Sequence, residues 1–159
     1  MTTSEPVPPD PRWAYFGRFD PVTGRPRPLI HADLIEMAEK WTTTSSTPPG
    51  VANLLNTARA LFGLAWFHYE SMVVAGMWSL LAVEASLRVR LESEQSLVKL
   101  IGRAQRDGLI TEQWAARLHA ARQMRNDLAH ARQQDAWTPG MASPLLATAH
   151  EVVAVLYPD

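Results

Sequence analysis

The chain contains no cysteine among its 159 residues. This absence excludes disulfides, thiolate catalysis and a zinc site built from cysteines. The five histidines are dispersed, and no two of them have the H-E-x-x-H spacing of a metalloprotease. We therefore expect no metal ion and no other cofactor.

Long hydrophobic runs are also missing. The most apolar stretch, MVVAGMWSLLAVEASL, is interrupted by Glu84 and is too short for a bilayer, which needs about 20 apolar residues. The N-terminus is polar and rich in proline, and no basic start followed by an apolar run is present, so it does not resemble a signal peptide. The sequence predicts a soluble, cytoplasmic protein that has no membrane partner.

Lysine is scarce, with 2 lysines against 13 arginines, and the net charge is −1. This charge argues against a protein that coats nucleic acid without regard to sequence. Residues 88–132, however, contain nine basic and five acidic residues, so this segment is positively charged. Arginine suits the recognition of phosphate, although the base composition of a genome more often explains an excess of arginine.

The length fits one domain, preceded by an arm over residues 1–28 that holds seven of the twelve prolines. Proline removes a backbone donor and disfavours helix in its neighbour, so the arm is expected to be extended. Its four aromatic residues, Trp13, Tyr15, Phe16 and Phe19, indicate that the middle of the arm packs on the domain, with a turn near DPVTGRP. The alternative is that these aromatics dock a partner.

Residues 29–159 form the single helical domain, because apolar residues recur there at steps of three and four. The pattern predicts helices over about 30–41, 51–66, 69–92, from Ser93 or Ser96 to Gly108, 111–134 and 144–157. No segment shows sustained alternation of the strand type. The expected fold is all-α, an up-and-down bundle of about five to six helices with an extended N-terminal arm.

One predicted helix carries the stretch ARQMRNDLAH, residues 121–130. On a helical wheel, one face gathers Arg122, Arg125, Asn126 and His130, and His119 lies near His130 but earlier along the helix. Ala121, Met124 and Leu128 lie on the other side, which is the expected buried stripe.

These residue types suit RNA cleavage without a metal. The reaction needs a base near the ribose 2′-hydroxyl, an acid for the leaving 5′-oxygen and a cation for the charge on the phosphate. Histidine supplies the base or the acid, and arginine binds phosphate oxygens with a fixed fork of donors. Because one helix supplies a single His130, a two-fold dimer is expected to bring two copies of the face to one phosphate.

The spacing of arginine and histidine is weak by itself, since a chain of this composition contains it by chance. Arg25 and His31 have a similar spacing, but they span RPRPLIH, where two prolines prevent a shared helical face. The two pairs therefore differ only in their context.

The context resembles the HEPN superfamily. RNDLAH, read as arginine, asparagine, three residues and histidine in a late helix, is similar to the signature of that family. The upstream stretch ARALFGLAWFHYESMVVAGMWSLLAVEASLRVRL resembles the paired long helices of bacterial members, and SLVKLIGRAQRDGLI follows in the usual order. The resemblance covers about residues 51–157.

The resemblance implies a metal-independent endoribonuclease whose active site forms at a homodimer interface and which acts as a toxin or in phage defence, with a separate antitoxin or regulatory protein as a partner. It implies catalytic roles for Arg125, His130 and Asn126, and a supporting role for Glu84. Arg122 is expected to contact phosphate or solvent, and His119 to lie at a surface or interface. Two alternatives stay open: a non-catalytic module that binds RNA or a protein, and a structural dimer, which is favoured if an internal carboxylate engages Arg125 and Arg125 is turned away from any groove.

Overall fold

A computed structural model describes residues 6–129 and 137–159 of the chain. The protein is an all-α bundle, as expected, with a small two-stranded sheet in its arm. The helices are α1 (His31–Glu39), α2 (Pro49–Leu64), α3 (Ser71–Leu91), α4 (Leu97–Arg106), α5 (Glu112–Ala129) and α6 (Pro139–Leu156).

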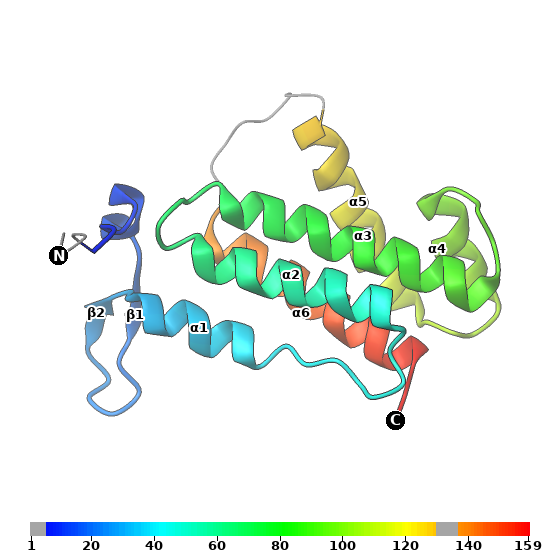
Figure 1. Cartoon of the computed structure of the whole chain (residues 1–159), viewed down its shortest axis with the longest axis horizontal. Helices are drawn as coiled ribbons and strands as arrows, with labels where there is room; N and C mark the ends of the chain where they lie inside the picture. Colours follow the sequence, from blue (N-terminus) through cyan, green and yellow to red (C-terminus); the bar gives the residue numbers. More distant parts are fainter. Residues whose placement is uncertain (1–5, 130–136) are drawn as a thin grey trace, which may run out of the picture.

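The long helices α2, α3 and α6 form the body of the bundle (Figure 1). Helices α2 and α3 lie side by side and run in opposite directions, and α6 packs along α3. Helix α4 lies at one end of the molecule and the arm at the other (Figure 1). Helix α5 leaves from the α4 end and leans away from the body, so its last turns stand above α3.

Local signals in the sequence set most helix ends. The expected break in the long helical region lies between Leu64 and Ser71, around WFHYES. Gly108 has a positive φ of 72° just after α4, a conformation that glycine adopts without steric cost, and it ends that helix as predicted. The Thr111 hydroxyl accepts a hydrogen bond from the Trp114 backbone N–H and so caps the start of α5, which lies where the sequence predicted a helix from residue 111.

The predicted start of α6 at residue 144 is wrong. Helix α6 begins at Pro139 with Thr138 as its N-cap residue, so Pro144 lies inside the helix. Thr138 and Pro139 present the same start signal as Ser143 and Pro144, a hydroxyl residue followed by proline. The helix begins at the earlier pair.

The core consists of two apolar clusters. The first lies toward the arm and includes Phe62, Met72 and Leu146, and the second lies toward α4 and includes Leu87 and Leu100. All five of these side chains are less than 2% exposed. Helices α2, α3, α5 and α6 contribute to both clusters, so these helices join the ends of the bundle.

The arm is more ordered than an extended chain. Its described part contains a 3-10 helix, η1 (Pro11–Tyr15), and an antiparallel hairpin of β1 (Gly17–Phe19) and β2 (Pro26–Pro28). The turn between the strands is the one predicted at DPVTGRP, but the strands were not predicted, because three residues are too few for a visible alternation. The arm packs on the bundle through Trp13, which is 2% exposed and donates its indole N–H to the Ala65 carbonyl at 2.8 Å.

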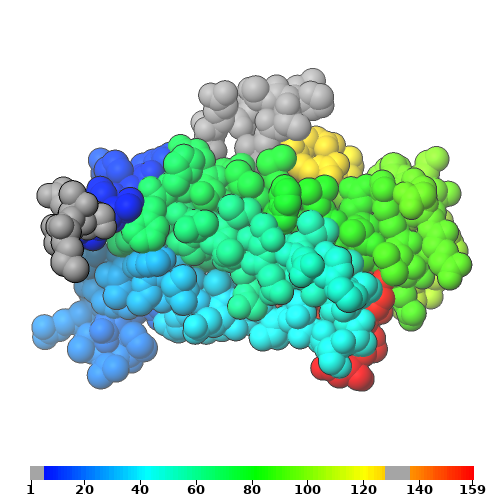
Figure 2. All heavy atoms as spheres, viewed as in Figure 1, coloured from blue at the N-terminus to red at the C-terminus, as the bar shows by residue number. Residues whose placement is uncertain are grey.

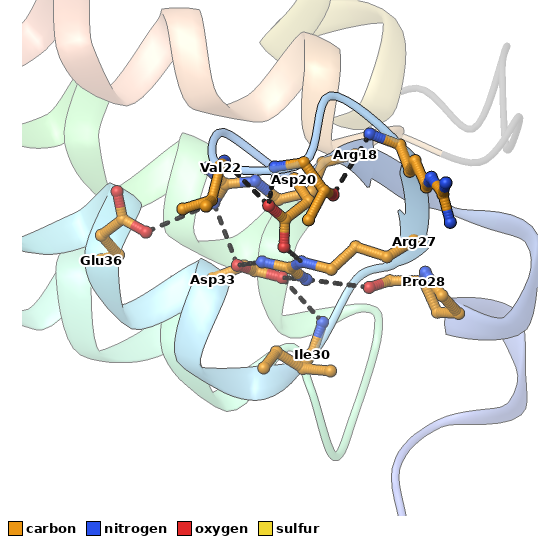
Figure 3. Close-up of polar contacts among 10 residues, drawn as sticks. Arg18, Asp20, Val22, Arg27, Pro28, Ile30, Asp33 and Glu36 are labelled. Atoms are coloured by element: carbon orange, nitrogen blue, oxygen red, sulfur yellow. Dashed lines mark hydrogen bonds and ion pairs between the residues drawn. The ribbon is translucent and has the colours of Figure 1, made fainter.

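A buried carboxylate fixes the hairpin to α1. Asp33 accepts hydrogen bonds from both terminal nitrogens of Arg27 at 2.6 Å, from Arg18 at 2.9 Å and from the Ile30 backbone N–H at 2.9 Å (Figure 3). The Arg27 guanidinium lowers the pKa of Asp33 to about 2. Figure 2 shows the hairpin projecting from the arm end of the molecule.

Among the described residues, α3 is long and apolar enough to cross a membrane by length and composition. Half of its most apolar window is buried inside the protein, and the core helix of a soluble protein passes the same test.

Candidate functional site

The residues singled out by the sequence lie on α5, which is described from Glu112 to Ala129. His130 lies outside the described residues. The structure therefore locates Arg122, Arg125, Asn126 and His119, and it leaves the histidine of the motif as a prediction from the sequence.

Arg125 contacts Glu84 of α3, which lies 41 residues earlier in the chain. The Arg125 Nη1 is 3.5 Å from the Glu84 Oε2, and the two side chains are 27% and 17% exposed. This distance is at the long limit of a hydrogen bond. No other described residue forms a hydrogen bond with the Arg125 guanidinium, so four of its five N–H donors have no partner in the described part of the chain.

Glu84 also holds a second arginine. Its Oε1 accepts a hydrogen bond from Arg88 Nη2 at 2.8 Å, one turn along α3, where the i,i+4 spacing brings the two side chains together. Arg88 in turn contacts Glu94 at 2.9 Å. Each oxygen of Glu84 thus contacts a different arginine, and the stronger of the two contacts is the one to Arg88.

Arg122 and Asn126 flank Arg125 on the same helix. Both are half-buried, and their side chains form no hydrogen bond with any other described residue. The Nε of Arg122 is buried without a partner in the described part of the chain. A buried N–H donor without an acceptor is unfavourable. A ligand oxygen that reached the Arg122 Nε could therefore accept a hydrogen bond from it.

The expected division of α5 into a buried and a polar face is wrong in part. Ala121 is buried as predicted, but the buried side continues through Ala115 and Leu118, which lie near Arg122 and Arg125 on the wheel. Both arginines are half-buried on the side of the helix that meets α3. The wheel gives relative angles only, whereas the neighbouring helices decide which angle points inward.

The remaining sequence candidates lie apart. His119 is half-buried, three residues before Arg122 on α5, and it forms no hydrogen bond with any described candidate. Arg25 lies in the hairpin turn, whereas His31 begins α1 and packs its ring against Phe67 at 5.0 Å between ring centroids. Arg25 and His31 therefore share no helix, as their prolines predicted.

An open groove of about 460 Å³ lies between α5 and α6, next to this cluster. Met124 and Ala121 line it from α5, and Met141 and Leu145 line it from α6. Arg117 and Glu151 place one charge of each sign at its walls. The sequence does not predict this groove, because the groove depends on how far α5 leans away from α6.

Within the described ranges, no group of three or more histidine, aspartate or glutamate side chains has the arrangement of a metal site. The cluster on α3 and α5 is instead one half-buried carboxylate, Glu84, that contacts two arginines, with Arg122 and Asn126 beside Arg125 on α5. Such a set can bind an anion that carries several oxygens, such as a phosphodiester.

Comparison of the chain with protein-family models, with curated proteins and with solved structures gave no match.

Proposed function

We propose that the protein is a metal-independent endoribonuclease that cleaves RNA by attack of the ribose 2′-hydroxyl on the adjacent phosphate. The observation that carries the proposal is the contact between Glu84 and Arg125, which joins the motif helix to the acid of the long upstream helix. The resemblance to the HEPN superfamily assigns a supporting role to that same acid.

Each motif residue has a role in the proposed reaction. His130 removes the proton of the 2′-hydroxyl, or donates one to the departing 5′-oxygen, in a dimer that supplies one histidine for each step. Arg125 and Arg122 bind the phosphate oxygens on which negative charge develops. Asn126 donates its amide N–H to the phosphate or orients the histidine ring. The products are a 2′,3′-cyclic phosphate and a 5′-hydroxyl.

Glu84 acts as a positioning residue in this scheme. Its Oε2 lies near one nitrogen of Arg125 and leaves the Nε and Nη2 edge of the guanidinium for a phosphate. Because the contact is 3.5 Å long, it orients the guanidinium without neutralising it through a tight paired bond. Arg88 holds the other oxygen and keeps the carboxylate in place.

The active site is composite, formed by two copies of the α5 face at a homodimer interface. In the cell, the protein acts as a toxin or phage-defence effector that a separate antitoxin or regulatory protein controls. Production of the protein is then expected to arrest growth, and the His130→Ala substitution is expected to relieve the arrest.

The direct test is cleavage of single-stranded RNA by the purified protein in EDTA, with the ends identified by mass spectrometry. We expect 2′,3′-cyclic phosphate ends, and complete loss of cleavage in the His130→Ala and Arg125→Ala proteins. The Glu84→Gln substitution keeps the size of the side chain and removes its charge. We expect it to lower cleavage about tenfold to a hundredfold, because it loosens Arg125 without removing it.

The chain supplies its own matched control. The Arg25 and His31 pair has a similar spacing and lies on two different elements away from α5, so Arg25→Ala and His31→Ala proteins are expected to cleave like the parent. Cleavage that persists in the folded His130→Ala protein, or that requires a divalent metal, contradicts the proposal.

A non-catalytic protein of the same fold, either a binding module or a structural dimer, is the second candidate. The contact between Arg125 and the internal Glu84 carboxylate is one of the conditions that favour the structural dimer. A binding module would instead bind RNA with a steep dependence on salt, or bind a protein partner, without any turnover. A filter-binding assay run beside the cleavage assay separates the two candidates.

A further inference from the structure

A cavity of about 570 Å³ lies between the arm and the bundle, away from the α5 cluster. The end of η1, the hairpin, α1 and the first turns of α6 all contribute to its walls. This volume lies in the range of about 300–1,000 Å³ that is typical of pockets for small molecules. The proposed ribonuclease site uses none of its residues.

Most of the wall of this open cavity is apolar. Phe16, Leu29 and Met37 form one wall, and Pro139 and Pro144 form the other. Leu29 is 6% exposed, and the Phe16 ring stacks on Tyr69 with 5.9 Å between centroids, so this wall is held by the core. The backbone of the prolines is stiff. Binding of a ligand in the cavity therefore costs little conformational entropy in this part of the protein.

Polar groups without partners gather at the α6 end of the cavity. The hydroxyls of Thr138 and Ser143 line it, and neither forms a hydrogen bond with a described residue. Pro144 has no backbone N–H, so the Gly140 carbonyl, four residues earlier, lacks its donor within the helix. These groups are available to form hydrogen bonds with a ligand in the cavity.

The charge at the cavity comes from Arg18. Its Nη1 donates to Asp33 at 2.9 Å and to Glu36 at 3.3 Å, which fixes the guanidinium in place (Figure 3). Its Nε and Nη2 form no hydrogen bond with described residues, and the side chain is 25% exposed. This pair of nitrogens is the edge with which arginine binds a carboxylate through two parallel hydrogen bonds.

The number of arginines at the cavity that still have free N–H donors indicates how much negative charge a ligand can carry. Arg27, the other arginine of the clamp, donates both of its terminal nitrogens to Asp33. Arg18 therefore presents a single unoccupied guanidinium edge, which matches one carboxylate better than a doubly charged phosphate. We propose that this cavity binds a small amphipathic carboxylate, with the carboxylate at Arg18 and the apolar body between Met37 and Pro144.

The test is a calorimetric titration of the full chain with 4-phenylbutyrate, which has a flat apolar body and one carboxylate. The matched uncharged probe is 4-phenyl-1-butanol. We expect saturable binding of one carboxylate per chain and affinity at least tenfold weaker for the alcohol, because the alcohol lacks the charge that pairs with Arg18. Absence of saturable binding, or equal affinity for the two probes, overturns the proposal.

Two substitutions locate the binding. Arg18→Met is expected to abolish the preference for the carboxylate over the alcohol, while Arg27 still holds the hairpin on Asp33. Its control is Arg25→Met, on the same hairpin but outside the cavity. Met37→Trp fills the apolar part of the cavity and is expected to weaken the affinity for both probes at least tenfold. Met141→Trp, in the α5–α6 groove, is expected to leave both affinities unchanged.

Thermal unfolding by circular dichroism confirms that each variant is folded before its titration is compared. If Met37→Trp does not fold, the double substitution of Thr138→Val and Ser143→Ala removes the two hydroxyls with little change in size, and we expect it to weaken the carboxylate at least threefold. A preference for the carboxylate that survives in folded Arg18→Met protein overturns the assignment of the charged end.

Discussion

Replacement of Asp33 by asparagine tests the ionic clamp between the arm and α1. The Asp33 side chain is 4% exposed, and it accepts four hydrogen bonds, three of them from arginines. Asparagine has nearly the same size but no charge, and its NH₂ group donates where Asp33 accepts. The substitution therefore leaves Arg18 and Arg27 without their shared anion and leaves the surrounding packing intact.

The magnitude follows from the pKa of Asp33, which the clamp lowers from 3.8 to about 2. One pKa unit corresponds to about 1.4 kcal/mol, so the charge on Asp33 is stabilised by roughly 2.5 kcal/mol. Solvent screens part of this, because Arg18 and Arg27 are 25% and 30% exposed. We expect Asp33→Asn to lower the free energy of unfolding by about 2 kcal/mol at pH 7, or the Tm by roughly 4–8 °C for a chain of this length.

The pH dependence has a definite sign. The pKa of Asp33 is lower in the folded protein than in the unfolded chain, so its contribution is complete above pH 4 and is lost as the pH falls from about 4 to about 2. Asp10 and Glu70 also have lowered pKa values because both contact Arg12, so the parent protein loses additional stability in this range. The difference between the parent and the Asp33→Asn protein isolates Asp33, and we expect it to shrink toward zero near pH 2.

The assay is urea denaturation followed by circular dichroism at pH 7, 4 and 2.5. Proton exchange of the Trp13 indole N–H, bonded to the Ala65 carbonyl, reports release of the arm without unfolding of the bundle. The control is Asp20→Asn, which removes a 31% exposed carboxylate from the turn of the same hairpin, and we expect it to cost clearly less stability than Asp33→Asn. Equal stability of the two variants at pH 7, or a difference that does not change with pH, refutes the reasoning.

Three further predictions concern the bundle. Gly76→Ala places a methyl group against the Trp137 ring, and we expect a loss of roughly 1–3 kcal/mol in urea denaturation; an unchanged midpoint contradicts the close contact. Leu100→Ala leaves a cavity at a fully buried position, with an expected cost of about 2–5 kcal/mol by the same measurement, and a cost below 1 kcal/mol argues against tight packing there. Burial lowers the pKa of His150, so the parent protein is expected to lose stability as the pH falls below 6.5, where the unfolded chain binds the extra proton. In the His150→Gln protein this slope between pH 7.5 and 5.5 is expected to be smaller, and an unchanged slope assigns it to another group.

Most of the helices could be predicted from the sequence, because their ends depend on local chemistry. Gly108 ends α4 through its positive φ, and Thr111 caps α5 through its hydroxyl. The errors have local causes as well. The predicted start of α6 at residue 144 is wrong because Thr138 and Pro139 carry the same signal as Ser143 and Pro144 five residues earlier, and the hairpin strands are too short to show an alternating pattern.

The candidate site could be predicted only in part. The order of the motif along α5 follows from the helical period, and the Glu84–Arg88 pair follows from its spacing. The clamp at Asp33 was missed, although one signal was present: the acid stands three residues after Ile30, where its carboxylate accepts the backbone N–H at the start of α1. Its two arginines lie 6 and 15 residues away, and no local rule connects them to it.

The sequence by itself determined the all-helical class, the arm, the break between α2 and α3, and the placing of Arg122, Arg125 and Asn126 on one helix. These features depend on backbone preferences and on the 3.6-residue period, which act over a few residues. Only the tertiary structure decided that Arg125 faces Glu84, which side of α5 is buried, and where the cavity beside Arg18 opens. Those features depend on how the helices pack against one another, and a contact across 41 residues has no counterpart in the local pattern of the chain.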